Sequence, residues 1–260
     1  MRLIGSGTQG RLAVMHIATL DQRPDLVGAL WDMPTVWPEF MRHDPISNLY
    51  YGLCTEQWPE YILVAEDPDE PGRLLAKGHS VPFFLPEGDE LPIDGWDGAL
   101  RRAVRARVAG DKPNIVSAIE IAVRPDRQGT GLSALMLAAM RDNAARLGFA
   151  DLVAPVRPNG AKDPAEPMTS YAYRTRDDGL PVDPWLRVHV RAGGVIEKIA
   201  TRSMVIPGTC AEWRDWTGLP FDTTGPVHVP KALTPVHADA EHDWAVYVEP
   251  NVWIRHRTGA

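Results

Sequence analysis

The 260-residue sequence is long enough to bury a sizeable core in one large domain or two small ones. Its 44% hydrophobic and 23% charged content is that of an ordinary soluble globular protein, and its net charge of −7 excludes a global basic field for nucleic acid or anionic lipid. No apolar run approaches the roughly 20 residues that span a bilayer. The start of the chain has no leader-like apolar segment, and Cys54 and Cys210 show no metal-ligand or redox spacing, so we expect a cytoplasmic protein with reduced thiols.

Helices and strands alternate along most of the chain, and the C-terminal part is rich in strands. The clearest helix covers 131–146, where apolar residues recur at helical spacing and Gly148 follows as a natural cap. This order predicts the α/β (α+β) class, with one domain around a central sheet. In chain order we expect a strand at 16–20, helices at 23–33 and 46–55, a hairpin of strands at 61–65 and 74–84, a helix at 97–108, a strand at 114–124, the helix at 131–146, a strand at 149–156, a helix at 185–192, and strands at 195–205 and 245–254.

A Gly-rich turn joins the strand at 114–124 to the helix at 131–146. Gly129 and Gly131 carry no Cβ atom, so the backbone of this turn can approach a ligand closely. The N–H groups of the turn and the positive end of the helix then converge on one point, which suits a pyrophosphate. Gln128 and Thr130 add neutral donors. The turn is predicted to be an anion site, and a purely structural Gly-rich turn is the alternative.

The segment 119–133 resembles the acyl-CoA-binding signature of the GNAT acyltransferase superfamily, which reads Arg or Gln, any two residues, Gly, any residue, then Gly or Ala. Gln128 and Gly131 fit this signature, and Ser133 replaces its final small residue. The resemblance implies that the strand before the turn splays from its neighbour and that Ile121 and Val123 hold the pantetheine arm through backbone groups. The acyl-CoA contacts that it implies are Ile121, Ala122, Val123, Arg127, Gln128, Gly129, Thr130, Gly131, Leu132, Ser133 and, after the next strand, Asn159.

A GNAT-like fold implies a mixed, mostly antiparallel central sheet flanked by helices. We expect one such domain over residues 11–260, with insertions near 86–113 and 160–184. The implied activity is acyl-CoA-dependent N-acyl transfer, in the first place acetyl transfer, by direct attack of an amine on the thioester of acetyl-CoA without a metal. Two alternatives stay open, a non-catalytic acyl-CoA-binding module and a GNAT-like decarboxylase or S-acyltransferase.

Two residues are candidates for acid–base catalysis. His189 lies four residues before Gly193, where the family often carries the Tyr that protonates the leaving thiolate, and an imidazole serves that role only while protonated. A His that merely packs is the alternative. Glu120 lies in the strand beside the expected thioester and is the candidate base for the acceptor amine. It can equally be a structural carboxylate, and relay through ordered water is a third route.

The acceptor side is predicted from three further residues. Ser117 stands where some family members carry a Glu or His that faces the acceptor, and Tyr171 and Tyr173 lie in the long connection at 160–184, which a surface loop explains equally well. The expected partner is a small-molecule amine, with neither nucleic acid nor membrane, on a monomer or homodimer.

Two further patterns carry little weight. Residues 5–10 spell G-x-G-x-x-G, the dinucleotide fingerprint, but too few residues precede it for a strand and no convincing βαβ unit follows. The polar cluster at 237–243 contains His and acidic residues without a known ligand spacing, so a solvated loop is expected there.

Overall fold

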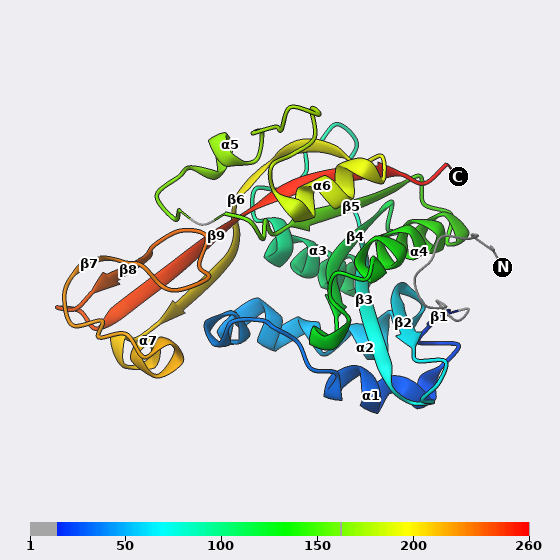
Figure 1. Ribbon diagram of the computed structural model, residues 1–260, viewed down its shortest axis with the longest axis horizontal. Helices are drawn as coiled ribbons and strands as arrows, with labels where there is room; N and C mark the ends of the chain where they lie inside the picture. The colour runs from blue at the N-terminus through cyan, green and yellow to red at the C-terminus, as the bar shows by residue number, and fades with distance from the viewer. Residues whose placement is uncertain (1–14, 162, 260) are drawn as a thin grey trace.

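A single mixed sheet organises residues 15–161 and 163–259, which are the residues that this computed structural model describes (Figure 1). The strand order is β1-β2-β3-β4-β5-β9-β8-β7, and β6 pairs with the other edge of β9. Among the strand pairs of the described residues, β4 and β5 alone are parallel, so the sheet is mixed and mostly antiparallel, as predicted. The strands are β1 (His16–Thr19), β2 (Ile62–Glu66), β3 (Leu74–Phe83), β4 (Ile115–Val123), β5 (Asp151–Val156), β6 (Val195–Gly208), β7 (Gly225–Val227), β8 (Val236–Asp239) and β9 (Trp244–Arg257).

Helices cover both faces of this sheet. Gly78 of β3 faces α4, because a Cβ atom at Gly78 would come within 2.9 Å of Met140 Sδ. The adjacent Lys77 points to the opposite face, where its Nζ donates to Leu30 O of α1. The helices are α1 (Val27–Asp32), α2 (Cys54–Gln57), α3 (Gly95–Ala109), α4 (Leu132–Arg146), α5 (Met168–Tyr171), α6 (Pro184–Arg191) and α7 (Cys210–Thr217), with the 3-10 turns η1 (Pro24–Leu26), η2 (Glu39–His43), η4 (Pro59–Tyr61) and η5 (Pro125–Arg127) and the π-helix η3 (Ser47–Tyr51).

The local sequence explains where the helices that frame the site begin and end. α4 buries Leu132, Met136 and Met140 at helical spacing, and it stops just before Gly148, whose φ of 87° favours glycine. α6 begins where Asp183 caps it. The Asp183 carboxylate accepts from Trp185 N and Leu186 N, at 2.9 Å each, and Pro184 at the first helical position has no N–H group that would need a partner.

The long strands β6 and β9 run out of the main body and form an arm, which carries β7, β8 and α7 at its far end (Figure 1). The arm has its own apolar core around Trp213 and Tyr247, separate from the main core under the sheet. Phe40 and Met41 of η2 enter this second core, so the N-terminal segment is anchored by the arm. Trp96 of α3 packs against both cores.

The predicted elements are present with shifted bounds, and the arm was missed. α7, β7 and β8 lie in a stretch for which no element was expected, and β9 continues to Arg257. β9 continues through Pro250. The extra residues of the bulge lie opposite, in β6, between Ala200, which pairs with Asn251, and Met204, which pairs with Glu249. None of the helices within 15–161 and 163–259 is long and apolar enough to cross a bilayer. The G-x-G-x-x-G pattern at 5–10 lies outside the described residues.

Candidate acyl-CoA and acceptor site

Strands β4 and β5 separate soon after they start to pair. Their parallel ladder contains Val116 with Leu152 and Ser117 with Val153, and within the described residues no later pairing joins the two strands. β4 nevertheless continues to Val123, and β5 continues beside β9. The resulting opening exposes the edge of β4 around Ile121 to a ligand, and one carbonyl of this stretch, Ile119 O, already accepts from Trp96 Nε1 at 2.7 Å. This is the splay that the sequence resemblance implied.

The Gly-rich turn after β4 leads into the N-terminus of α4. Gly129 and Gly131 have φ values of 75° and 86°, and a Cβ atom built at either position would meet nothing within 4 Å. Glycine is therefore needed for the backbone conformation, and the space above the turn is open. No side chain in the described part of the chain caps α4, so the first N–H groups of this 15-residue helix are available to an anion. The Thr130 hydroxyl instead donates to Arg127 O at 2.7 Å, within the turn.

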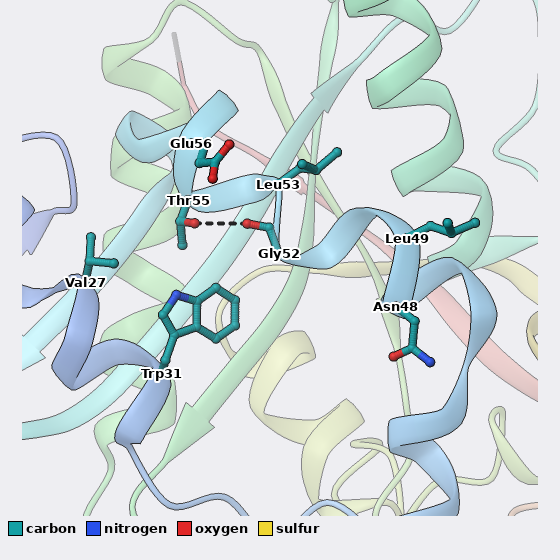
Figure 2. Close-up of a pocket in the computed structure, with 8 residues that line it drawn as sticks. All are labelled: Val27, Trp31, Asn48, Leu49, Gly52, Leu53, Thr55 and Glu56. Atoms are coloured by element: carbon teal, nitrogen blue, oxygen red, sulfur yellow. Dashed lines mark hydrogen bonds between the residues drawn. The ribbon is translucent and has the colours of Figure 1, made fainter.

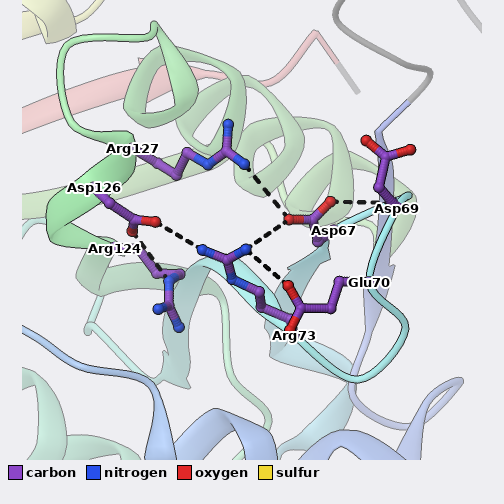
Figure 3. Close-up of polar contacts among 7 residues, drawn as sticks. All are labelled: Asp67, Asp69, Glu70, Arg73, Arg124, Asp126 and Arg127. Atoms are coloured by element: carbon purple, nitrogen blue, oxygen red, sulfur yellow. Dashed lines mark hydrogen bonds and ion pairs between the residues drawn. The ribbon is translucent and has the colours of Figure 1, made fainter.

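Ion pairs brace this turn against the β2–β3 hairpin (Figure 3). Arg73 of the hairpin lies 2.7 Å from Asp126, and Arg127 lies 3.6 Å from Asp67. Arg127 is 44% exposed, so its guanidinium can still turn toward a phosphate. The network holds Asp126 and Arg127 of η5 and thereby supports the turn that follows them.

A cluster of polar side chains surrounds Glu120 on the face of the sheet opposite α4. Glu120 pairs with His79 across β3 and β4, and its Oε2 lies 3.1 Å from His79 Nδ1 and 3.9 Å from Lys77 Nζ. Tyr51 of η3 donates its hydroxyl to the same Oε2, and Trp37 Nε1 donates to Oε1 at 2.9 Å. The carboxylate thus has partners on one neighbouring strand, β3, and on two irregular segments that are far apart from it in the sequence.

The charge state of this cluster follows from its contacts. Burial alone would raise the pKa of Glu120, but the hydrogen bond and charge of His79, the charge of Lys77 and the Tyr51 hydroxyl hold that pKa at about 2. Burial lowers the pKa of His79 below 6.5 despite Glu120, and burial raises the pKa of Tyr51 well above 10. Near neutral pH the cluster therefore contains a carboxylate, a neutral imidazole and a neutral phenol.

An open pocket lies between α1 and α2 on the same face (Figure 2). Its volume is about 560 Å³, and Trp31 forms one wall. Trp31 also packs edge-on against Tyr51, with ring centroids 5.8 Å apart, and lies 6.3 Å from the His79 ring. The pocket therefore adjoins the Glu120 cluster through Trp31. Its lining combines apolar side chains with one carboxylate and consists of Val27, Trp31, Asn48, Leu49, Gly52, Leu53, Thr55 and Glu56.

Some sequence-predicted residues lie away from this cluster. Ser117 is fully buried at the start of the splay, and its hydroxyl lies 3.4 Å from Ala118 O. Tyr171 is buried and donates to Asp183 at 3.0 Å, whereas Tyr173 is 53% exposed. Asn159 is exposed just after β5. Of the expected acceptor residues, none contacts Glu120 through an interaction that the structure records.

His189 lies near the C-terminal end of α6 and is almost completely buried. Its Nδ1 lies 2.9 Å from Nε2 of His256, a residue paired with Leu152 at the beginning of β5. Burial, and then the neighbouring His256, lower the pKa of His189 to about 3. A neutral imidazole has no extra proton to give to a thiolate near neutral pH. In addition, His256 holds His189 near the start of β5, whereas the opening between β4 and β5 lies toward the C-terminal ends of these strands. These surroundings favour a packing role for His189.

Sequence reasoning found Glu120 but missed its partners. Lys77 and His79 are polar residues in a strand that otherwise reads as apolar, which was a usable signal, since a buried charge needs a partner. Trp37 and Tyr51 come from η2–η3 and the segment before it, where no regular period marks an inward face. Over 15–161 and 163–259, no group of three or more His, Cys, Asp or Glu side chains could hold a metal ion, and at 237–243 Asp239 pairs with His242 at 3.0 Å instead.

The splayed strands and the uncapped helix behind a Gly-rich turn are the arrangement that the sequence resemblance implied for an acyl-CoA-dependent acyltransferase. No family model matches the chain, but an arginine N-acetyltransferase, avaD from Aspergillus versicolor, is 32% identical over 270 aligned positions that cover 92% of this chain and 93% of that protein. The chain belongs to the GNAT superfamily of N-acyltransferases and is an N-acetyltransferase of that type.

Solved structures agree with this fold at lower identity. The loading GNAT-like domain of CurA from Lyngbya majuscula superposes with a TM-score of 0.55 at 17% identity, over 95% of this chain and 99% of that one. The GNAT-like decarboxylase GphF, solved with isobutyryl-CoA, gives a TM-score of 0.56 at 16% identity, over 94% of this chain and 99% of that one. These two likenesses support the GNAT-type fold of this chain.

Proposed function

We propose that this protein transfers the acetyl group of acetyl-CoA to the amine of a small molecule, with L-arginine as the first acceptor to test. The observation that carries the proposal is the opening between β4 and β5 directly beside the Glu120 cluster. One side of β4 can hold a thioester, and the opposite face of the sheet offers polar groups to an incoming amine. Arginine is suggested by the Aspergillus versicolor relative, which is an arginine N-acetyltransferase.

The co-substrate would bind along the splay and at the N-terminus of α4. We place the pyrophosphate at the turn of Gln128 to Ser133, because Gly129 and Gly131 leave it open and the helix is uncapped. The pantetheine arm would follow the free edge of β4 at Ile121 and Val123. The remaining acyl-CoA contacts in this proposal are Ala122, Arg127, Thr130, Leu132 and Asn159.

The acceptor would enter through the pocket between α1 and α2. Its apolar wall includes Trp31 and Leu49, both substantially exposed, and Glu56 supplies a negative charge. An indole face and a carboxylate are groups that favour an ammonium or guanidinium ion. Tyr173, on the exposed part of the 160–184 segment, stays a candidate for further acceptor contacts.

In the reaction the amine nitrogen attacks the thioester carbonyl, a C–N bond forms, and the C–S bond breaks to release the CoA thiolate. A backbone N–H near Ile121 would stabilise the oxyanion of the tetrahedral intermediate. The Glu120 cluster would receive the proton that the amine loses.

An acceptor screen tests this function. The protein is incubated with acetyl-CoA and L-arginine, related guanidines, simple primary amines and no amine, and free thiol is followed together with the mass of the product. The proposal expects thiol release that requires an amine and an N-acetylated product. Tight acetyl-CoA binding without release would indicate a binding module, and carbon dioxide from malonyl-CoA without an amine would indicate a decarboxylase.

A further inference from the structure

The carboxylate of Glu120 is poorly placed to act as a base itself. Its Oε1 accepts from Trp37, and its Oε2 accepts from Tyr51 and lies 3.1 Å from His79 Nδ1, with Lys77 at 3.9 Å. Hydrogen bonds from several donors stabilise the carboxylate anion and lower its pKa, so Glu120 is a weak acceptor for a further proton. The arrangement is that of a carboxylate that orients a neighbour.

His79 offers what Glu120 lacks. Its Nδ1 is bound to the cluster, 3.0 Å from the Tyr51 hydroxyl and 3.1 Å from Glu120. Its Nε2 is buried and has no hydrogen-bond partner in the described part of the chain. When Nδ1 carries the proton and donates it to Glu120, Nε2 presents an unused lone pair. A buried polar atom without a partner is uncommon and calls for an explanation, and a catalytic role is one.

We propose that His79, through Nε2, is the catalytic base that takes the proton from the acceptor amine, and that Glu120 and Tyr51 are positioning residues for its ring. This assignment rests on the proposed amine acetylation. The Trp31 indole lies 6.3 Å from the His79 ring, between centroids, and also lines the pocket between α1 and α2, so this one side chain separates the ring from the pocket proposed for the acceptor.

The proton balance is complete without another reactant. As the C–N bond forms, the amine proton moves to Nε2 and the imidazole becomes an imidazolium beside the Glu120 carboxylate, which stabilises it. The electron pair of the C–S bond leaves with sulfur, and the thiolate takes up a proton from solvent. His79 returns its proton to water, and the neutral imidazole is restored for the next turnover.

The groups around His79 are consistent with this cycle. Glu120 from β4 favours the charged ring, Lys77 from β3, the strand of His79 itself, disfavours it, and Tyr51 from η3 is neutral. Cys54 of α2 lies near Tyr51, and burial raises its pKa to about 12, so it adds no charge at neutral pH. Glu120 is the one anion among these groups.

Two matched variants separate His79 from Glu120 as the base. His79→Asn places an amide donor where Nδ1 stands and removes Nε2, whereas Glu120→Gln keeps the shape of the carboxylate and removes its charge. His79→Asn should lower kcat by about 10²-fold or more and abolish the acidic limb of the kcat–pH profile. Glu120→Gln should also lower kcat, but it should keep that limb and move it to lower pH, because the imidazole loses its anion. Both variants should leave KM for acetyl-CoA nearly unchanged.

His256→Asn is the control, since it makes the same change at another buried histidine outside this cluster. It should keep both kcat and the limb. If the kcat of His79→Asn is within a few-fold of the wild-type kcat, the assignment of His79 as the base is overturned, and the proposed acetylation is unaffected. If His79→Asn does not fold, the Glu120→Gln profile decides, because loss of the acidic limb in that variant would make Glu120 the base. A wild-type protein that binds acetyl-CoA but acetylates no amine would overturn the function itself.

Discussion

Gly131 holds a left-handed backbone conformation at the point where the helix dipole of α4 begins, with φ at 86°. Open space surrounds its missing Cβ. A side chain there would be strained by roughly 1 kcal/mol yet meet no clash. The position therefore lets charge be introduced at the proposed pyrophosphate site without disturbing the core.

Gly131→Glu should abolish the rise in melting temperature that CoA produces, because a carboxylate would stand where the phosphates bind. Gly131→Asn is the matched control, since Asn tolerates the left-handed region and is neutral. It should keep a weaker shift. Differential scanning fluorimetry over a CoA titration makes the comparison, and a folded Gly131→Glu protein with wild-type CoA affinity would remove the pyrophosphate from this turn.

His189 and His256 form a buried pair of neutral imidazoles. Burial is the main cause that lowers their pKa values, to about 3 and about 4. Below the ordinary histidine pKa of about 6.5, these two residues bind protons in the unfolded chain but stay neutral in the folded protein. The unfolding free energy is therefore fully present above pH 6.5 and decreases as the pH falls toward 4.

Replacing both residues by Leu should flatten this pH dependence. Urea unfolding at about pH 7.5 and about pH 5 should show a smaller loss for the double variant than for the wild type, where each imidazole contributes a slope of up to about 1.4 kcal/mol per pH unit. With saturating substrates kcat should stay within a few-fold. A fall in kcat of about 10²-fold or more in single-turnover experiments would instead restore His189 as the thiolate-protonating acid.

At the scale of elements, a pair of buried acids joins η2–η3 to α3. Asp97 of α3 accepts from Val205 N at 3.2 Å, and Asp44 accepts from Ser47 N at 2.7 Å. Each has a second carboxylate oxygen that is buried without a partner within the described residues. Burial, and then Asp44, raise the pKa of Asp97 to about 8. The segment that carries Tyr51 is therefore docked on α3 next to a carboxyl that stays protonated at neutral pH.

The folded protein keeps a proton on Asp97 that the unfolded chain loses above about pH 4, so stability falls as the pH rises from about 4 to about 8. Asp97→Asn imitates the protonated carboxyl and should make the protein more stable than wild type at about pH 8.5, as measured by urea unfolding. Asp142→Asn, at an exposed position on α4, should leave the profile unchanged. An Asp97→Asn variant that is less stable than wild type at that pH would show that the carboxylate is ionised in the fold.

The elements that the sequence predicted best are those whose own residues fix their boundaries. α4 has an apolar stripe with glycines at both ends, and the β2–β3 hairpin has a turn dense in Asp, Pro and Gly, so the elements of the half that we propose for acyl-CoA could be predicted. The acceptor half could not, because His79 meets Glu120 only through cross-strand register, and Tyr51 and Trp37 reach it from irregular segments. His189 was predicted as a catalytic acid because it lies four residues before Gly193. That spacing does not reveal that the His189 ring is buried against His256.

In the whole molecule, the N-terminal segment and α3 contact both the arm and the candidate site. η2 places Phe40 in the core of the arm, and the same N-terminal segment supplies Trp37 to Glu120. Trp96 of α3 touches both cores, donates to Ile119 O and stacks near Tyr51 at a centroid distance of 6.1 Å. The proposed acceptor side of the site is thus built on the contact between the arm and the main body.

The central claim is acetyl transfer from acetyl-CoA to an amine at the opening between β4 and β5. The most direct measurement is a reaction with acetyl-CoA and L-arginine in which free CoA and N-acetylated product are quantified together by mass spectrometry, beside a reaction with Gly131→Glu. We expect equal amounts of CoA and acetylated amine from the wild-type protein, CoA release that depends on the amine, and neither product from the variant. CoA release without any acetylated amine across the amine panel would contradict it.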